Sequence, residues 1–207
     1  MKILCIDTTT STCSVAIFKG KKIFYKNKIV LRQYTKYIFP MIEDLFKKSK
    51  ISNKSIDAIS FNCGPGNFTG IKVAQCIANS IFFIKKVPIL AIPLYIILAE
   101  TIKKKIQLNR VVISIRYKKK KMYFASCLKN NLGNWIFLKK KEEKFSVKKI
   151  LNYVKYIKER TIFLGYGKKE ILKVKNNKNL IFHDLCKIDA RHVGIVAKLF
   201  FKKKITF

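Results

Sequence analysis

The chain has 207 residues, with 45 Lys and Arg against 11 Asp and Glu, and a formal net charge of +34. Its hydrophobic content of 49% is enough to fill a core and argues against a disordered protein. No secretory signal is visible, and the longest apolar run, residues 87–99, contains two prolines and is too short to span a bilayer. We therefore expect a cytoplasmic protein of one large domain or two small lobes.

The predicted elements alternate in a regular way along both halves of the chain. Three strands over 2–25 come first, and after them we expect a helix at 33–48, a strand at 56–62, a helix at 68–84, a strand at 88–92 and a helix at 93–104. The second half predicts strands at 110–115, 122–128 and 135–138, a helix at 146–157, a strand at 161–164 and a helix at 189–203. This order indicates an α/β protein with two mixed sheets flanked by helices, divided into lobes at 1–105 and 106–207.

The six cysteines and two histidines do not form a metal-binding pattern. The cysteines stand singly at 5, 13, 63, 76, 127 and 186, with no CxxC pair, and the histidines at 183 and 192 lack an HxxxH spacing. We expect reduced cysteines in the core, no disulfide and no metal site.

A glycine-rich turn lies between the predicted strand 56–62 and the helix that follows it. Glycine permits positive φ and close backbone approach, and Asn67 is a good N-cap. A strand, turn and helix start would also offer N–H groups to an anion, but the spacing matches neither the Walker nor the Rossmann pattern, so a structural corner is the competing interpretation. The residues of this structural turn are Gly64, Pro65, Gly66, Asn67, Thr69 and Gly70, with Phe68 between Asn67 and Thr69.

Two more segments accompany the turn: Asp7-Thr8-Thr9-Thr10-Ser11 at the end of the first strand, and the start of an amphipathic helix at residues 32–42. In order and spacing the three segments resemble the N-terminal half of the TsaB (YeaZ) family, over residues 1 to about 100. That family opens with Ile-Asp-Thr-Ser/Thr, continues with a His-x-x-x-Leu-Leu-Pro helix and carries Gly-Pro-Gly-Ser-Phe-Thr-Gly. Tyr34 stands here at the position comparable to the family's histidine.

The resemblance implies an actin-like ATPase (ribonuclease-H-like) fold and a role in making threonylcarbamoyladenosine in tRNA. It implies a non-catalytic subunit that supports TsaD, the enzyme that transfers the threonylcarbamoyl group to N6 of adenosine 37 in ANN-decoding tRNAs. The expected partners are a TsaD homologue in a heterodimer, the TsaE ATPase, and tRNA through the complex. ATP and Mg²⁺ are expected on the partners and not on this chain, and a homodimer of the chain alone is left open.

The helices at 33–48 and 68–84 carry apolar side chains beyond one core-facing stripe. Phe39 lies off the stripe of the first helix, and the second helix is apolar on two faces, one with Ala74 and Ile84 and the other with Cys76 and Phe83. Such a helix is usually buried on two sides, inside the lobe or against another protein. With the resemblance, we expect a partner interface that contains Tyr34, Tyr37, Phe39, Met41, Phe68, Val73, Ala74, Ile77 and Phe83.

Few residues are suited to catalysis. Asp7 is the one carboxylate at the end of a predicted central strand, where α/β sites form. Where the family often has Asp-Ala-Arg in the second lobe, this chain has Ser114-Ile115-Arg116, so a second carboxylate is missing. We expect no catalytic residue, and interpret Asp7, Thr8, Thr9 and Arg116 as a stabilising turn or a vestigial nucleotide cleft. The alternative is a small actin-like phosphotransferase or ATPase that uses Asp7 as base or magnesium anchor.

Positive charge is concentrated in the second half of the chain. Residues 1–100 carry 15 basic and 5 acidic side chains, and residues 101–207 carry 30 and 6. Lysine runs such as 118–121, 139–141 and 202–204 would attract a nucleic-acid backbone. Arginine, the better bidentate phosphate ligand, occurs only five times, so base-composition drift toward lysine is the competing explanation. A general RNA-binding protein is therefore a further alternative.

Overall fold

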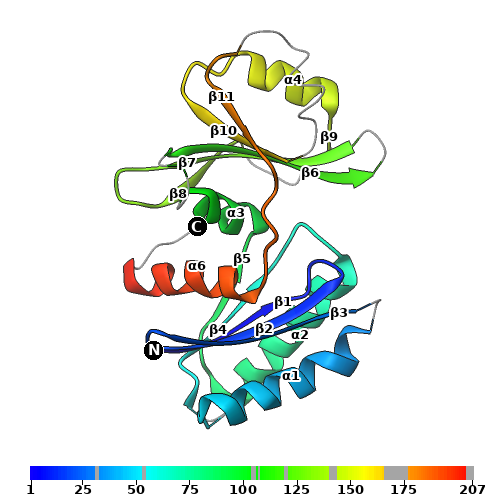
Figure 1. Cartoon of the computed structure of the whole chain (residues 1–207), viewed down its shortest axis with the longest axis vertical. Helices are drawn as coiled ribbons and strands as arrows, with labels where there is room; N and C mark the ends of the chain where they lie inside the picture. Colours follow the sequence, from blue (N-terminus) through cyan, green and yellow to red (C-terminus); the bar gives the residue numbers. More distant parts are fainter. Residues whose placement is uncertain are drawn as a thin grey trace. The chain divides into compact units, whose positions relative to one another are not determined.

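The computed structural model describes residues 1–30, 33–52, 55–103, 106, 108–118, 121–139, 144–165 and 177–203. The chain forms two compact units (Figure 1). Of the described residues, the first unit contains Met1–Ile97 and Lys187–Lys203, and the second lies within Leu98–Cys186. Within the described residues, no helix is both long and apolar enough to cross a membrane.

The first unit is built on a five-stranded mixed sheet in the order β3-β2-β1-β4-β5. The first three strands form an antiparallel meander, and β4 and β5 continue the sheet parallel to β1. The elements in chain order are β1 (Lys2–Asp7), β2 (Thr12–Lys19), β3 (Lys22–Ile29), α1 (Tyr34–Ser49), β4 (Ala58–Asn62), α2 (Phe68–Lys85) and β5 (Ile89–Ile92).

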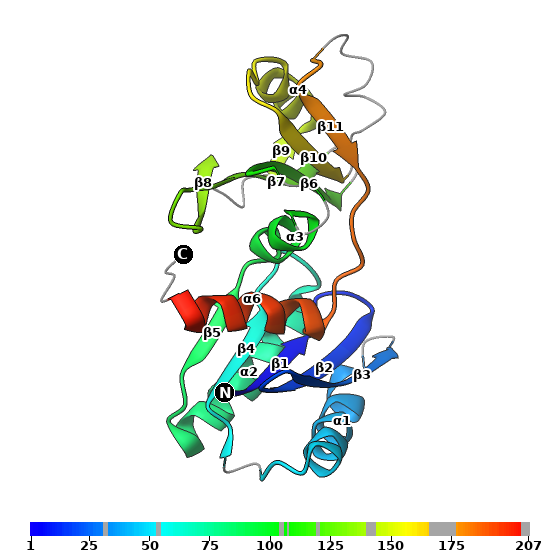
Figure 2. The same ribbon diagram turned by 60° about the vertical axis from the view of Figure 1, so that its left-hand side comes forward.

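Helices cover both faces of this sheet. Helices α1 and α2 lie on one face, and the C-terminal helix α6 (Ala190–Lys203) crosses the other (Figures 1 and 2). Every residue of β4 is buried, as expected for a central strand covered on both sides. The larger core cluster, which includes Leu4, Ile6 and Ile38, lies between the sheet and α1 and α2.

The second unit contains a six-stranded sheet with the path β11-β10-β6-β7-β8, and β9 pairs with β7. Strands β6, β7 and β8 form an antiparallel meander, and β10 and β11 add to β6 in parallel. Its elements are α3 (Leu94–Lys103), which begins in the first unit, β6 (Arg110–Lys118), β7 (Lys121–Lys129), β8 (Trp135–Lys139), β9 (Lys144–Ser146), α4 (Val147–Lys155), β10 (Thr161–Gly165) and β11 (Leu180–His183).

A buried ion pair ties α3 to this second sheet. Glu100 Oε2 accepts hydrogen bonds from Lys129 Nζ at 2.6 Å and from Trp135 Nε1 at 2.8 Å. All three side chains lie in the second unit, so the helix that follows β5 contributes to the sheet that comes after it in the chain.

The two units repeat one topology, a three-stranded meander followed by two parallel strands. This arrangement confirms the predicted actin-like, ribonuclease-H-like fold with two mixed sheets flanked by helices. The division at 1–105 and 106–207 needs correction, because α6 packs on β1 and belongs to the first unit. Strands β9 and β11, with three and four residues, were missed.

Candidate functional site

The three sequence motifs meet at one place, the carboxyl end of β1. The turn after Asp7 is held from two sides. On one side, Thr8 Oγ1 donates to Gly70 O at 2.6 Å, and the backbone N–H of Asn67 donates to Thr9 O at 2.7 Å. On the other, Tyr34 Oη donates to Thr10 O at 2.6 Å. We call residues 7–10 together with 64–70 the β1 corner.

Glycine is required in the corner because the threonine turn packs directly on it. A Cβ added at Gly70 would lie 1.8 Å from Thr8 O, and one added at Gly66 would lie 2.6 Å from Thr9 O. Gly64 has φ +94°, a conformation that favours glycine. Asn67 caps α2, since its Oδ1 accepts from the Gly70 N–H at 3.0 Å. The structural-corner interpretation is sufficient to explain the motif.

The Asp7 carboxylate is buried in the corner and occupied by internal hydrogen bonds. Its side chain is 2% exposed, and Oδ1 accepts from Thr9 N at 3.0 Å and from Thr9 Oγ1 at 2.7 Å. Asn62 Nδ2 lies 3.4 Å from the same oxygen and donates to Thr9 Oγ1 at 3.1 Å. Burial raises the pKa of Asp7, the hydrogen bonds from Thr9 and Asn62 oppose this rise, and the charge of Asp189 adds to it.

The Asp7 carboxylate receives its hydrogen bonds from Thr9 and Asn62 of its own unit. Within its own turn, Oδ1 of Asp7 accepts from both the backbone N–H and the hydroxyl of Thr9. In the part of the chain that the structure describes, no group of three His, Cys, Asp or Glu side chains could hold a metal. Arg116, the fourth residue of the expected cleft, is exposed near the end of β6 and belongs to the second unit.

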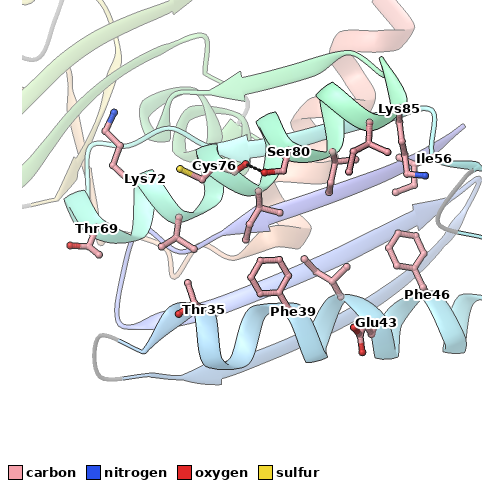
Figure 3. A pocket seen from close by; sticks show the side chains of 15 residues that line it. Thr35, Phe39, Glu43, Phe46, Ile56, Thr69, Lys72, Cys76, Ser80 and Lys85 are labelled. Atoms are coloured by element: carbon pink, nitrogen blue, oxygen red, sulfur yellow. Dashed lines mark hydrogen bonds between the residues drawn. The ribbon is translucent and has the colours of Figure 1, made fainter.

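An apolar groove of about 610 Å³ runs between α1 and α2 on the first unit (Figure 3). Phe39 and Phe46 project from α1 toward α2, which contributes residues along almost its whole length. Ser80 Oγ donates to Cys76 O at 2.9 Å within α2. The lining residues are Thr35, Phe39, Ile42, Glu43, Phe46, Ile56, Thr69, Lys72, Val73, Cys76, Ile77, Ser80, Ile81, Ile84 and Lys85.

The charges at the groove differ between its two helices. Glu43 is the acidic lining residue and comes from α1, whereas Lys72 and Lys85 are the basic ones and come from α2. Lys72 Nζ also lies 5.7 Å from the ring centroid of Phe68. A protein that fills the groove would therefore meet a mainly apolar floor with opposite charges on its two helices.

The expected interface residues divide into an exposed and a buried group. Phe39, Phe68 and Phe83 are 52%, 74% and 69% exposed. Val73 lines the groove, and so does Ile77, which is only 6% exposed and also belongs to the core cluster. Tyr37 is half-buried, with Lys28 Nζ 4.0 Å from its ring centroid. Tyr34, Met41 and Ala74 are at most 7% exposed and pack in the core of the unit, so their assignment to the interface surface is corrected.

Two details of α2 also differ from expectation. Ile84, which the periodicity places on the same face as the buried Ala74, is 79% exposed and lines the groove. Cys76, expected in the core, is exposed and lines the groove, whereas Cys5, Cys13 and Cys127 are buried as expected. The second apolar face of α2 is therefore open in this chain.

Sequence reasoning missed Asn62 and Ser14 in the corner. Asn62 Oδ1 accepts from the Gly64 N–H at 3.0 Å, and Ser14 Oγ accepts from the Ala190 N–H at 2.9 Å. The signal for Asn62 was present, since it is a polar residue at the carboxyl end of a buried strand. Nothing in the sequence near Ser14 points to a helix start 176 residues later.

The sequence is similar to a family model and to proteins of known name. The family model described as "TsaD: tRNA N6-adenosine threonylcarbamoyltransferase" matches residues 26–136. A relative from Buchnera aphidicola subsp. Schizaphis graminum, named tRNA threonylcarbamoyladenosine biosynthesis protein TsaB, is 33% identical over 180 residues, which is 87% of this chain and 84% of that protein. The chain belongs to the TsaB (YeaZ) family. This confirms the resemblance seen in the sequence.

Two other comparisons concern a second relative and the fold. The protein of the same name from Buchnera aphidicola subsp. Acyrthosiphon pisum is 35% identical over 134 residues, 65% of this chain and 61% of that protein. The solved structure of YeaZ from Pseudomonas aeruginosa superposes with a TM-score of 0.76 at 20% identity, covering 99% of this chain and 95% of that chain. The match to the TsaD model spans more than half of the chain and includes α1, α2 and the groove.

Proposed function

We propose that the chain is a non-catalytic subunit of tRNA modification that binds and supports its homologue, the tRNA N6-adenosine threonylcarbamoyltransferase TsaD. TsaD would transfer the threonylcarbamoyl group to N6 of adenosine 37 in ANN-decoding tRNAs, and the TsaE ATPase would be the third partner. Membership of the TsaB family supports the pathway, because the relatives carry the name of threonylcarbamoyladenosine biosynthesis.

The observation that carries the pairing is the open apolar groove between α1 and α2. Side chains such as Phe39 project into it without covering one another, and burying each exposed aromatic would stabilise a complex by about 1.5–3 kcal/mol. A continuous apolar surface of this kind on a folded protein typically marks an interaction site. The chain's own net charge of +34 opposes pairing with a second copy, which favours a different partner.

The burial of the Asp7 carboxylate favours a non-catalytic subunit over a phosphotransferase. A magnesium anchor or base needs a carboxylate that faces the substrate, and the Asp7 carboxylate is buried and bonded to Thr9. We place ATP and Mg²⁺ on the partners and none on this chain. A cytoplasmic location, expected from the sequence, remains part of the proposal.

The test is co-expression of the chain with the TsaD homologue of the same organism, followed by size-exclusion chromatography with light scattering. We expect a stable one-to-one complex. Phe39→Asp places a charge in the groove without touching the core and should weaken binding by at least tenfold, or about 1.4 kcal/mol.

The matched control is Leu132→Asp, which introduces the same charge at a side chain that is 78% exposed in the second unit. It should leave the complex intact. Absence of any complex with the wild-type chain would contradict the proposed pairing, and equal loss in both variants would contradict its assignment to the groove.

A further inference from the structure

A second surface, distant in sequence from the groove, lies at the C-terminal end of α4 in the second unit. Four cationic side chains, Lys155, Lys158, Arg160 and Lys178, are exposed there together with Tyr156. We call these five residues the α4 patch. Figure 1 shows α4 beside β10 and β11, the strand that follows Lys178.

The patch is held together by two asparagines from the segment before β11. Asn177 Nδ2 donates to Val154 O at 2.9 Å and to Ile157 O at 2.8 Å, and Asn179 Nδ2 donates to Lys158 O at 2.9 Å. These bonds join the segment before β11 to carbonyls at the end of α4, where Val154 O also accepts from the backbone N–H groups of Tyr156 and Ile157. They also fix Lys178, which lies between the two asparagines, against the turn that carries Lys158.

Tyr156 is the unusual member of the α4 patch. It is 74% exposed, and Lys155 Nζ lies 5.7 Å from its ring centroid. Ile157, the next residue, is 5% exposed and supplies the core contact at this point of the chain. The tyrosine ring is thus left on the surface among cations, the arrangement that proteins use to stack bases of single-stranded nucleic acids.

The four cationic side chains of the α4 patch outnumber the carboxylates near them in the sequence. Glu159 is the only carboxylate between residues 146 and 165, and its Oε2 accepts from Arg110 Nη1 at 3.0 Å. Lys155, Lys158, Arg160 and Lys178 therefore present their charges to solvent without local compensation from that carboxylate.

We propose that the α4 patch binds RNA, with its lysines and arginine on the phosphates and an unpaired base stacked on Tyr156. Duplex DNA fits less well, since its bases are already stacked and only phosphates would be contacted. An anionic membrane also fits less well, because the apolar residues Ile150 and Val154 of α4 face the core and cannot insert into lipid. The proposal does not depend on the pairing with TsaD, since the groove lies in the first unit.

The experiment measures fluorescence anisotropy of a labelled oligouridylate of roughly 15 nucleotides, a length that spans a typical single-strand site, with the purified full chain over a series of salt concentrations. We expect Tyr156→Ala to weaken binding by roughly tenfold, whereas Tyr156→Phe keeps the ring and should keep the affinity. The triple variant Lys155→Gln, Lys158→Gln, Lys178→Gln should reduce the slope of log K against log salt by about 2, because three phosphate contacts are lost.

The matched control is Lys21→Gln, Lys22→Gln, Lys47→Gln, which removes the same charge from exposed positions of the first unit. It should change the affinity by less than about twofold. Circular dichroism checks that each variant is folded. If the triple lysine variant unfolds, Tyr156→Ala still tests the RNA contact, because Tyr156 is exposed.

Three outcomes would overturn the proposal. Equal losses in the two lysine variants would mean that binding follows total charge and not the α4 patch. Unchanged RNA affinity in Tyr156→Ala would show that no base stacks on this ring. Equal affinity for duplex DNA or for phosphatidylglycerol vesicles would point to a general attraction to polyanions.

Discussion

At the residue scale, Asp7 shows how a residue type that suggests catalysis can serve the fold instead. Its carboxylate ends β1 in the place where α/β enzymes put catalytic acids, yet its partners are Thr9 and Asn62 of its own unit. The charge is buried at 2% exposure, and Asp189 adds a repulsive contribution. The turn after β1 needs an oxygen at this position to accept the hydrogen bonds from Thr9, and it does not need a negative charge.

This leads to a prediction on Asp7→Asn and pH. The raised pKa of Asp7 means that the folded chain holds the proton more tightly than the unfolded chain, so this group lowers stability as pH rises from the usual pKa of Asp through the raised value. Asparagine keeps the Oδ1 acceptor for Thr9 and removes the charge. Urea unfolding between pH 4 and pH 8 should find the variant more stable at pH 7, with a difference that shrinks toward pH 4.

A variant less stable than wild type across this range would show that the charge itself holds the turn. Asp189→Asn is a useful comparison, because the pKa of Asp189 is shifted in the opposite direction and the variant should lower stability at neutral pH. Although burial alone would raise the pKa of Asp189, hydrogen bonds from His192 and Arg191 outweigh it and hold the pKa below its usual range. Its stabilisation is therefore present at neutral pH and lost in acid.

Local residue patterns predicted the corner well and its distant partners poorly. The hydroxyl turn after Asp7, the glycines and the Asn67 cap each have a short-range signature, and the structure contains all of them. The bond from Ser14 to the start of α6 has none, because it joins residues 176 apart. For the same reason Tyr34 was assigned to an interface, while its hydroxyl in fact bonds to Thr10 O inside the unit.

At the element scale, the β1 corner sets the position of α2 against the sheet. The first turn of α2 approaches the β1–β2 turn so closely that only hydrogen fits at Gly70. Because the helix carries one wall of the groove, its placement fixes the groove's width. Any substitution that moves α2 away from the β1 corner should therefore change the width of the groove.

We predict that Gly70→Ala destabilises the chain by about 3 kcal/mol, since its Cβ would overlap the backbone carbonyl of Thr8. Chemical denaturation followed by far-UV circular dichroism measures this. The control is Gly20→Ala, where φ is +58° and nothing lies within 4 Å of the new Cβ, so backbone strain alone should cost about 1 kcal/mol. An equal loss of stability at Gly70 and Gly20 would contradict the importance of the close approach between Gly70 and the Thr8 carbonyl.

Helices were predicted to within a few residues, and two of the shortest strands were not predicted. The apolar periodicity of α1 and α2 is strong enough to define them from sequence. Strands β9 and β11 have three and four residues, which is too short for a clear alternation of apolar and polar side chains. The open face of α2 was ambiguous, because periodicity does not tell whether an apolar face meets the lobe or solvent.

At the scale of the whole molecule, the first unit depends on a helix from the far end of the chain. Gly194 of α6 lies directly on the ring of Phe18, and a Cβ there would come within 2.0 Å of the ring. Strand order along the chain could not reveal this, since α6 follows the strands of the second unit. The predicted division at 105 and 106 failed for that reason.

Gly194→Val should therefore loosen the first unit alone, by about 3 kcal/mol. Amide hydrogen exchange should become faster in β1 and β2, while β6 and β7 keep their protection. The control is Lys202→Val, the same new side chain at an exposed position of α6, with an expected cost below about 0.7 kcal/mol. Unchanged exchange in β1 would contradict the role assigned to α6.

The return of the chain to its first sheet also determines the order of events at the ribosome. All five strands of the first unit leave the exit tunnel early, but one face of their sheet stays uncovered until residues 190–203 have been made. The sheet residues of the second unit are complete before that point. The part of the chain that is translated first is thus the part that finishes folding last, and nascent chains halted before α6 would expose the apolar face of β1 to chaperones.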